Sequence, residues 1–341
     1  MRRAAVIAAT LLALAGCGDT QQVRQPDLVV AGGVEDRSPA PSAGDPARGD
    51  DALRIAVVTH GQAANPFWVI VRNGIDAAAR QVDVSVSYRS PDTYSVERMK
   101  TLIDEAVVAR PDGLVVSIPS RGVAAPIRRA VRAGIPVVSM NSGSDAFRRL
   151  GALAHVGQPE ARAGAAAGRR LARDGVRRGL CVNQQSGNVA LDLRCGAFIR
   201  AIRRAGGDAD VLPVDVQDRA GTRQRLTEAI RSGRVDGVLT LDTEGAQAAL
   251  DAVRSDGLPD RIALATFDLS PDVLQAVRDG RMRFAVDQQG YLQGYLPVVL
   301  LAQRIRYGLL AAEGEVIPTG PTLVTRARAA QVIRLSERGI R

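Results

Sequence analysis

Histidine, lysine and cysteine are scarce in this chain of 341 residues, which has two histidines, three cysteines and a single lysine, Lys100. The histidines, His60 and His155, stand alone in the sequence, which argues against a histidine-based metal site. No Cys-x-x-Cys pair is present, so the usual zinc and redox signatures are missing. The sequence therefore predicts neither a bound metal nor a cofactor.

Catalytic signatures are missing as well. The chain has no Gly-x-Ser-x-Gly elbow, no Gly-x-x-x-x-Gly-Lys-Ser/Thr phosphate loop and no Gly-x-Gly-x-x-Gly fingerprint. Asp242 and Asp268 could form an acid/base pair, but no local feature of the sequence raises the pKa of either carboxyl group. These absences favour a binding protein over an enzyme.

Positive charge is in excess but is not clustered, with 45 Lys and Arg residues against 36 Asp and Glu residues. The bases are spread singly or in pairs along apparent helices and are interleaved with acids, which is typical of a solvated surface. The charge therefore gives no support to a nucleic-acid partner. With 46% hydrophobic residues, the chain is long enough to form two compact lobes.

The N-terminus has the pattern of an export signal. Two arginines precede an apolar run over residues 4–15, which is too short to span a bilayer permanently. The run ends in Leu14-Ala15-Gly16-Cys17, which resembles the lipobox of bacterial lipoproteins and implies a signal peptide over residues 1–17 with a lipidated Cys17 as a membrane anchor. Ordinary cleavage near Ala15 is the alternative. Residues 18–51 are rich in Gly, Pro, Ser, Asp and Gln and predict a flexible tether.

Two further cysteines, Cys181 and Cys195, lie in the folded part of the chain. In an oxidising compartment such a pair is a disulfide candidate. The sequence cannot place their Cα atoms within the roughly 7 Å that a bridge requires, so a disulfide and two separate buried thiols both remain open.

Apolar runs alternate with helical patterns from residue 53 onward. Strands that alternate with helices of about 12 residues predict parallel sheets covered by helices on both faces. Two successive series of this kind predict an α/β fold with two doubly wound parallel-sheet lobes. The expected strands cover residues 53–58, 82–88, 113–118, 135–140, 179–183, 209–214, 235–241, 261–267 and 283–286.

Polar residues follow most of these runs, and ligands of open α/β sheets bind beyond the carboxyl ends of the strands. Asn and Gln both donate and accept hydrogen bonds, and an ionised carboxylate can accept from two hydroxyls, so such a row suits a polyhydroxylated ligand. For Asp268 the alternative is a capping role for a helix starting near Pro271. Gln185 is a further polar residue in this row, beside Gln184. The candidate ligand-binding residues are His60, Asn65, Asn141, Ser142, Gln184, Asp242, Asp268 and Gln288.

Phe67 and Trp68 are the aromatic residues nearest this row. Adjacent residues of a helix point about 100° apart, so one of them can face the crevice while the other enters the core. An aromatic face suits the C–H groups of a sugar, but a core position is an equally ordinary fate for Trp68. We include both as candidate contacts.

With these residues in view, the chain resembles the type I periplasmic binding proteins of the ribose and galactose kind, the solute receptors of sugar ABC transporters. The likeness runs from about Leu53 to near the C-terminus. The motifs that carry it are Asn65-Pro66-Phe67-Trp68, Gly134-Ile135-Pro136-Val137-Val138, Val235-Asp236-Gly237-Val238, Thr266-Phe267-Asp268, and Asp279-Gly280 followed by Gln288.

The resemblance implies two lobes joined by a hinge. It implies that Asn65 and Phe67, with Trp68 beside them, contact the ligand from the first lobe. It also implies that Arg194 donates to a ring or hydroxyl oxygen, and that Asp242, Asp268 and Gln288 complete the second side. The expected boundaries are residues 52–158 plus 289–317 for the N-terminal lobe and 159–288 plus 318–341 for the C-terminal lobe, with crossing segments near 156–160, 286–291 and 316–320.

The resemblance further implies a monomer in the periplasm or on the outer face of the cytoplasmic membrane, which delivers a sugar or polyol to an ABC transporter permease. Two departures leave the ligand open among pentose, hexose, cyclitol and linear polyol: Asn141-Ser142 stands where many sugar receptors carry Asp-Arg, and Asp242 where Asn is common. The alternatives are a sugar-sensing partner of a membrane signalling protein and, more remotely, an exported α/β enzyme. A repressor is disfavoured, because the leader and tether occupy the place of its helix-turn-helix.

Overall fold

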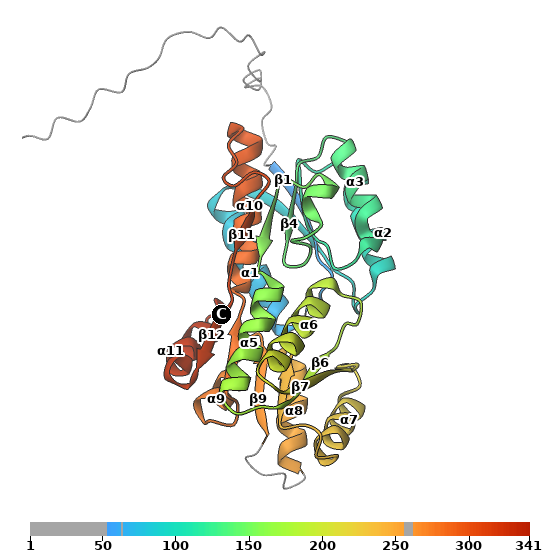
Figure 1. Cartoon of the computed structure of the whole chain (residues 1–341). Coiled ribbons are helices and arrows are strands. Elements are labelled where there is room, and N and C mark those ends of the chain that lie inside the picture. Colours follow the sequence, from blue (N-terminus) through green and yellow to red (C-terminus); the bar gives the residue numbers. More distant parts are fainter. Residues whose placement is uncertain (1–52, 63, 256–261) are drawn as a thin grey trace, which may run out of the picture. The chain divides into compact units, whose positions relative to one another are not determined.

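The computed structural model describes residues 53–62, 64–255 and 262–341 (Figure 1). The predicted signal peptide, the lipidated Cys17 and the predicted tether lie outside the described residues. All the described residues belong to one compact unit. In this part of the chain, no helix combines the length and the apolar character needed to cross a membrane.

Strands and helices alternate along the described chain. The first series comprises β1 (Leu53–Val58), α1 (Pro66–Gln81), β2 (Val84–Arg89), α2 (Val96–Val108), β3 (Gly113–Ser117), the 3₁₀ turn η1 (Arg121–Val123), α3 (Ala124–Arg132), β4 (Val137–Met140), α4 (Phe147–Leu150) and β5 (Ala154–Gly157). The second series comprises α5 (Glu160–Arg173), β6 (Arg178–Asn183), α6 (Val189–Arg204), β7 (Asp208–Pro213), α7 (Arg219–Arg231), β8 (Gly237–Thr240), α8 (Thr243–Ser255), β9 (Ala263–Phe267), α9 (Pro271–Arg278) and β10 (Phe284–Asp287). The chain ends with α10 (Gly290–Tyr307), β11 (Val316–Pro318), β12 (Thr322–Thr325) and α11 (Arg326–Glu337).

The strands form two six-stranded sheets, in the orders β11-β5-β4-β3-β1-β2 and β12-β10-β9-β8-β6-β7. All pairs are parallel except β10 with β12, which are antiparallel. In each sheet the strand order reverses beside the first strand of its series, which is the arrangement of a doubly wound sheet. The prediction of an α/β fold with two parallel-sheet lobes is confirmed.

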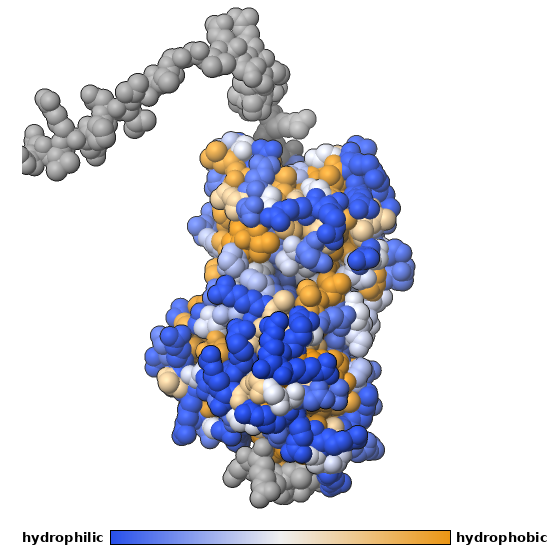
Figure 2. All heavy atoms as spheres, viewed as in Figure 1, coloured by the Kyte–Doolittle hydropathy of each residue, from blue (hydrophilic) through white to orange (hydrophobic). Residues whose placement is uncertain are grey.

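Each sheet carries an apolar core on both faces. In the first lobe, α1 and α10 pack on one face and α2, α3 and α4 on the other. In the second lobe, α5 and α6 cover one face, while α7, α8, α9 and α11 cover the other. Hydrophilic residues lie among apolar ones on the face drawn in Figure 2.

Glycines allow the tightest helix contacts. A Cβ atom on Gly74 of α1 would lie 2.0 Å from the backbone oxygen of Tyr291, and one on Gly294 of α10 would lie 2.0 Å from the backbone oxygen of Val71. The backbones of α1 and α10 therefore approach each other directly. This contact holds α10, which follows the second series in sequence, against the first sheet.

The chain passes between the two lobes three times: from β5 to α5, from β10 to α10 and from β11 to β12. Gln293 of α10 is fully buried at these passages. Its Nε2 donates to the backbone oxygen of Gln288 (2.9 Å) and to Oγ1 of Thr319 (3.1 Å), and its Oε1 accepts from Nδ2 of Asn141 (2.9 Å). One side chain thus ties together the end of β4 and two of the passages.

Three strands are absent from the sequence prediction. β5 has the sequence Ala-His-Val-Gly, with one β-branched residue, and β11 and β12 lie at or beside the segment expected to cross between lobes. His155 in β5 is fully buried, and its Nδ1 lies 2.9 Å from Oγ of Ser139. The side-chain pairing within the sheet, rather than strand propensity, accounts for a buried histidine in this strand.

Candidate ligand-binding site

Arg194 lies at the centre of a buried polar network. It belongs to α6, and its Nη2 donates to Oε1 of Glu160 and to Oε1 of Gln288, each at 3.0 Å, while its Nε donates to Oε2 of Glu160 at 2.5 Å. The guanidinium carbon lies 4.5 Å from the ring centroid of Phe267. Burial opposes the charge of Arg194, but the Glu160 carboxylate outweighs it and raises the pKa of the guanidinium. The residue is therefore a fixed, charged donor.

Asp268 follows β9 and adopts a left-handed backbone conformation, with φ of 68°. Its Oδ1 accepts from Nε2 of Gln288 at 2.5 Å, and the side chain is buried. Ser270, not Asp268, caps α9, because its side chain accepts from the backbone N–H of Val273. The alternative capping role for Asp268 is therefore wrong.

Asp242 follows β8 and is also buried. Its Oδ1 accepts from the backbone N–H of Gly245 at 2.7 Å, at the start of α8. Burial raises its pKa to about 7, helped by the nearby carboxylates of Glu244 and Asp268. Burial likewise raises the pKa of Asp268 to about 6, against the opposing effect of Arg194. No local feature of the sequence predicts these shifts; burial in the tertiary structure raises the pKa of both carboxyl groups.

A cavity of about 460 Å³ opens beside Asp242. Polar groups and aromatic rings line it from both lobes. The first lobe contributes Gln62, Asn65, Trp68, Thr93 and Tyr94. The second lobe contributes Gln184, Gln185, Asp215, Val216, Gln217, Asp242 and Glu244.

Asn65, Trp68, Gln184, Gln185 and Asp242 line the cavity. Asn65 also caps α1, since its Oδ1 accepts from the backbone N–H of Phe67 at 3.1 Å. Oε1 of Gln184 is buried and has no hydrogen-bond partner among the described residues. Gln184 thus has an unpartnered acceptor buried in the wall of the cavity.

Phe67 and Trp68 have different surroundings. Both are 6% exposed and belong to the core between the first sheet, α1 and α10, but of the two only Trp68 also lines the cavity. Trp68 packs over Gly61, where a Cβ atom would overlap its indole ring, and stands edge-on to His60 with 5.1 Å between ring centroids. Phe67 packs against Gly290 instead.

His60 lies beneath Trp68 and does not reach the cavity. Burial, with a smaller effect of Arg194, lowers its pKa to about 3, so the ring is neutral near pH 7. Nδ2 of Asn188 can only donate, so the 3.1 Å contact makes Nε2 of His60 the acceptor and Nδ1 the protonated atom. Nδ1 then donates to Oγ of Ser117 at 2.9 Å. His60 therefore joins the first lobe to α6 of the second.

Asn141 and Ser142 are likewise turned toward the lobe junction. Asn141 is bonded to Gln293, and Oγ of Ser142 lies 3.2 Å from the backbone oxygen of Ile118 and 3.3 Å from Oδ1 of Asn188. The structure thus brings Arg194, Asp268 and Gln288 into one hydrogen-bonded network, but none of these three residues lines the cavity. Asp242 does line the cavity, and the charge of Asp268 acts on it. His60, Asn141 and Ser142 surround the junction.

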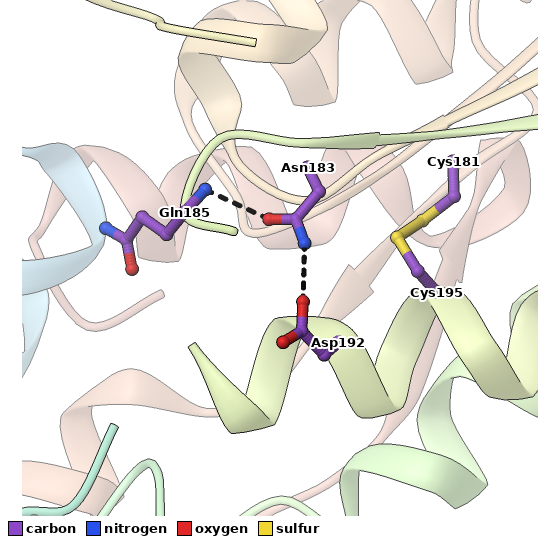
Figure 3. The surroundings of a disulfide bond; sticks show 5 residues. All are labelled: Cys181, Asn183, Gln185, Asp192 and Cys195. Carbon is purple, nitrogen blue, oxygen red and sulfur yellow. Dashed lines mark hydrogen bonds between the residues drawn. A yellow bond between two sulfur atoms is a disulfide. The ribbon is translucent and has the colours of Figure 1, made fainter. Parts of the chain in front are cut away.

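A disulfide fixes α6 beside this network. Cys181 of β6 and Cys195 of α6 are joined, with S–S at 2.01 Å and Cα atoms 5.6 Å apart (Figure 3). Asn183, at the end of β6, donates from Nδ2 to Oδ1 of Asp192 at 2.9 Å, as Figure 3 shows. Because Cys195 follows Arg194 directly, both links restrain the helix turn that carries the guanidinium.

Several residues of the site have no signal in the sequence analysis. Glu160 opens α5 directly after β5, a strand that the sequence did not predict, and Asn188 caps α6. Tyr94 and Gln217 lie in connections between elements. In the described part of the chain, no group of three or more His, Cys, Asp or Glu residues could hold a metal ion.

Comparisons with known proteins agree with this architecture. A carbohydrate transporter from Acidothermus cellulolyticus 11B, solved in complex with myo-inositol, is 36% identical with a TM-score of 0.80, and the match covers 85% of this chain and 100% of that one. A solute-binding protein of an ABC transporter from Burkholderia graminis C4D1M, in complex with D-arabinose, shares the fold at 21% identity and a TM-score of 0.74, covering 82% and 98% of the two chains.

The xylose/arabinose-binding protein XylF of Sulfolobus acidocaldarius is 25% identical over 270 residues, which are 73% of this chain. The match spans 65% of the length of that curated relative. The family model for the periplasmic binding protein domain matches residues 55–308, most of the described chain. The chain therefore belongs to the periplasmic binding protein family, and its two parallel-sheet lobes are those of the type I members it resembles.

Proposed function

We propose that this protein is an extracytoplasmic solute receptor that captures a sugar or polyol between its lobes and delivers it to an ABC transporter permease. The observation that supports this proposal most is the cavity between the two lobes, with Asp242 in its wall. Asp268, whose charge acts on Asp242, belongs to the hydrogen-bonded network with Gln288 and Arg194. Relatives that bind myo-inositol, or xylose and arabinose by name, support a ligand with several hydroxyl groups.

The chemistry of the side chains fits such a ligand. Asp242 and Asp268 can each accept from two hydroxyls, Arg194 can only donate, and the amides of Gln184 and Asn65 can do both. Trp68 offers an apolar surface for C–H groups. A ligand with hydroxyls on both sides of a ring would satisfy donors and acceptors of both lobes at once.

Closure of the lobes is the proposed means of capture. Asn188 of the second lobe contacts His60 and Ser142 of the first, and the backbone N–H of Val189 donates to the backbone oxygen of Pro119 at 2.9 Å. Parting these contacts while the three passages act as the hinge would open the cavity to solvent. The proposed lobes comprise residues 52–158 plus 289–317 and residues 159–288 plus 318–341.

The proposal includes a cleaved leader over residues 1–17, a lipid on Cys17, a tether over residues 18–51 and a monomeric receptor outside the cytoplasm. Membership of a periplasmic binding protein family supports an extracytoplasmic place. We further propose binding without turnover, so that a bound ligand is recovered unchanged. Mass spectrometry of the N-terminal peptide tests the cleavage and the lipid on Cys17. Mass spectrometry of the extracted ligand tests binding without turnover.

Thermal unfolding with a panel of monosaccharides, cyclitols and linear polyols tests the binding function, because a ligand of the folded state raises the melting temperature. We expect a defined subset of the panel to stabilise the protein, with affinities confirmed by calorimetry. Small-angle scattering should then show compaction on binding. No stabilisation by any member of the panel would contradict the proposal, and recovery of a chemically altered ligand would favour an enzyme.

A further inference from the structure

The cavity has a charge opposite to that of the chain. The protein carries a net charge of +9, yet the described residues that line the cavity include three carboxylates, Asp215, Asp242 and Glu244, and no arginine or lysine. Another groove, of about 660 Å³, is different, since three arginines, Arg121, Arg128 and Arg149, line it with a single acid, Asp145. Negative charge is therefore concentrated at the cavity against the general excess of positive charge.

Asp242 is the buried member of this group. Its side chain is 6% exposed, and among the described residues its only hydrogen bond is the one from the backbone N–H of Gly245 to Oδ1. Its second oxygen has no partner and no cation forms an ion pair with the carboxylate. A buried carboxylate is normally paired, because burial of an isolated charge is costly. Asp242 therefore has room for a donor that the chain itself does not supply.

The nearby cations interact with other carboxylates. Arg194 is bonded through both Nε and Nη2 to Glu160, and its remaining electrostatic attraction acts on Asp268. Arg219, at the start of α7, acts on Glu244. The pair of Arg194 and Glu160 is neutral as a unit, so the carboxylates of Asp268 and Asp242 leave this end of the site net negative when both are ionised.

Two aromatic rings complete the surroundings. Trp68 and Tyr94 line the cavity, and both lie within 6.0 Å of the His60 ring, centroid to centroid, in edge-on contacts. Because His60 is neutral, neither ring carries a cationic neighbour of its own there. Trp68 and Tyr94 thus share the cavity wall with Asp242, and an aromatic face attracts an organic cation more strongly than a neutral group of the same shape.

We infer that the ligand is an aminated polyol, an amino sugar or an aminocyclitol, whose ammonium group binds the free oxygen of Asp242. The inference rests on the proposed solute-binding function and narrows its ligand class. The hydroxyls of the ligand contact the amides of the cavity wall, while the ammonium supplies the positive partner that the Asp242 carboxylate lacks. A neutral polyol would leave that charge unbalanced or require a protonated carboxyl.

The affinity of an ammonium ligand should depend on pH. The groups facing Asp242 are Glu244 on α8 and Asp268 after β9, with Asp215 after β7 in the same cavity wall and no facing cation. An ammonium ligand needs the ionised carboxylate, so its affinity falls as the pH drops below about 7, where Asp242 takes up a proton. A neutral polyol has no such requirement.

The test compares matched ligands by calorimetry on the full-length wild-type protein near pH 7. The pairs are D-glucosamine with D-glucose, and an aminodeoxy-inositol with myo-inositol, with N-acetyl-D-glucosamine to keep the nitrogen but remove its charge. We expect an amine to bind at least about tenfold tighter than its neutral counterpart, the effect of one charge-assisted hydrogen bond. In Asp242→Asn the ratio of the two affinities should fall by a similar factor, and in Glu244→Gln by less.

Asp210→Asn is the matched control, because it removes the same charge from the same lobe at an exposed position outside the cavity, and its affinity ratio should equal that of the wild type. Tighter binding of the neutral member of each pair, or a ratio unchanged in both cavity variants, would overturn the inference and leave the proposed receptor function intact. Absence of binding by all five compounds would also overturn the inference, while the wider panel of monosaccharides, cyclitols and linear polyols tests the receptor function separately.

Discussion

The Arg194 guanidinium and the Glu160 carboxylate form a two-point ion pair with side chains only 3% and 2% exposed. Glu160 begins α5, and Arg194 lies on α6, so the pair joins the two helices that cover one face of the second sheet. Both also touch amides that lead toward the lobe passages: Gln158 donates to Glu160 and Gln288 accepts from Arg194. Glu160 therefore positions Arg194 without belonging to the cavity wall.

Replacing Glu160 by Gln should be strongly destabilising. The change leaves the buried Arg194 without its counter-charge, and breaking a buried ion pair costs about 3–5 kcal/mol. Denaturant unfolding measures the loss. Glu97→Gln is the control, since Glu97 is 81% exposed in its pair with Lys100 and should cost under about 1 kcal/mol. Equal losses in the two variants would show that the buried pair has no special role.

Asp268→Asn and Ser270→Ala should separate binding from capping. Asn tolerates the left-handed backbone of Asp268 but removes the charge, so ligand affinity should fall by about tenfold or more with little loss of stability. Ser270→Ala removes the cap of α9 and should cost about 1 kcal/mol of unfolding free energy with unchanged affinity. Calorimetry and thermal unfolding of both variants check this. Unchanged affinity in Asp268→Asn, with a loss of affinity in Ser270→Ala, would mean that the binding role of Asp268 is assigned wrongly.

Gly164 should not tolerate a side chain. A Cβ atom there would lie 2.1 Å from the backbone oxygen of Arg194, where α5 meets α6. Gly164→Ala must push the helices apart and should cost about 1–3 kcal/mol, with weaker ligand binding because Arg194 moves. Gly196→Ala, on α6, meets only the flexible end of Arg200 at 3.3 Å and should be neutral or stabilising. Similar melting temperatures for the two variants would contradict this reasoning.

The stability of Asp242→Asn relative to wild type should depend on pH. The folded pKa of Asp242 is about 7 and the ordinary value is 3.8, so the folded state holds one more proton between these values. The contribution of Asp242 to stability is present below about pH 4 and is lost as the pH rises through about 7. Asn does not titrate, so the variant should gain on the wild type across that window.

Urea midpoints at a series of pH values measure this difference. Asp210→Asn, at an exposed position, should run parallel to the wild type at every pH. A constant difference between Asp242→Asn and wild type would mean that Asp242 titrates as an exposed carboxyl does.

The sequence predicted most of the fold because the strands carry its clearest patterns. Runs such as Leu53–Val58 and Gly113–Ser117 are rich in β-branched and aliphatic residues and stand between helical periodicities. The rule that ligands bind at the carboxyl ends of strands singled out Asp242, which lines the cavity, and Asp268 and Gln288, which are bonded to each other and do not line it. Their roles in binding stay predictions.

The remainder depends on contacts between distant residues. Glu160 lies just after β5, a strand that forms because it pairs with its neighbours in the sheet. The role of Asn188 depends on its contact with His60 of the other lobe, which the sequence does not show. The raised pKa of Asp242 follows from burial, which no local pattern encodes. Adjacent positions show the same limit: Phe67 and Trp68 are equally buried, yet of these two only Trp68 reaches the cavity.

The disulfide between Cys181 and Cys195 should stabilise the second lobe and hold Arg194 in place. It closes a loop with a sequence separation of 14, for which chain entropy gives about 3 kcal/mol. The double change Cys181→Ser and Cys195→Ser should lower the free energy of unfolding by about that amount and weaken ligand binding, because the turn of α6 next to Arg194 loses its link to β6. Unfolding with and without reductant provides the measurement. Reductant should lower the unfolding free energy of the wild type but not that of the double variant. An equal decrease in both proteins would mean that the disulfide is not the cause of the stabilisation.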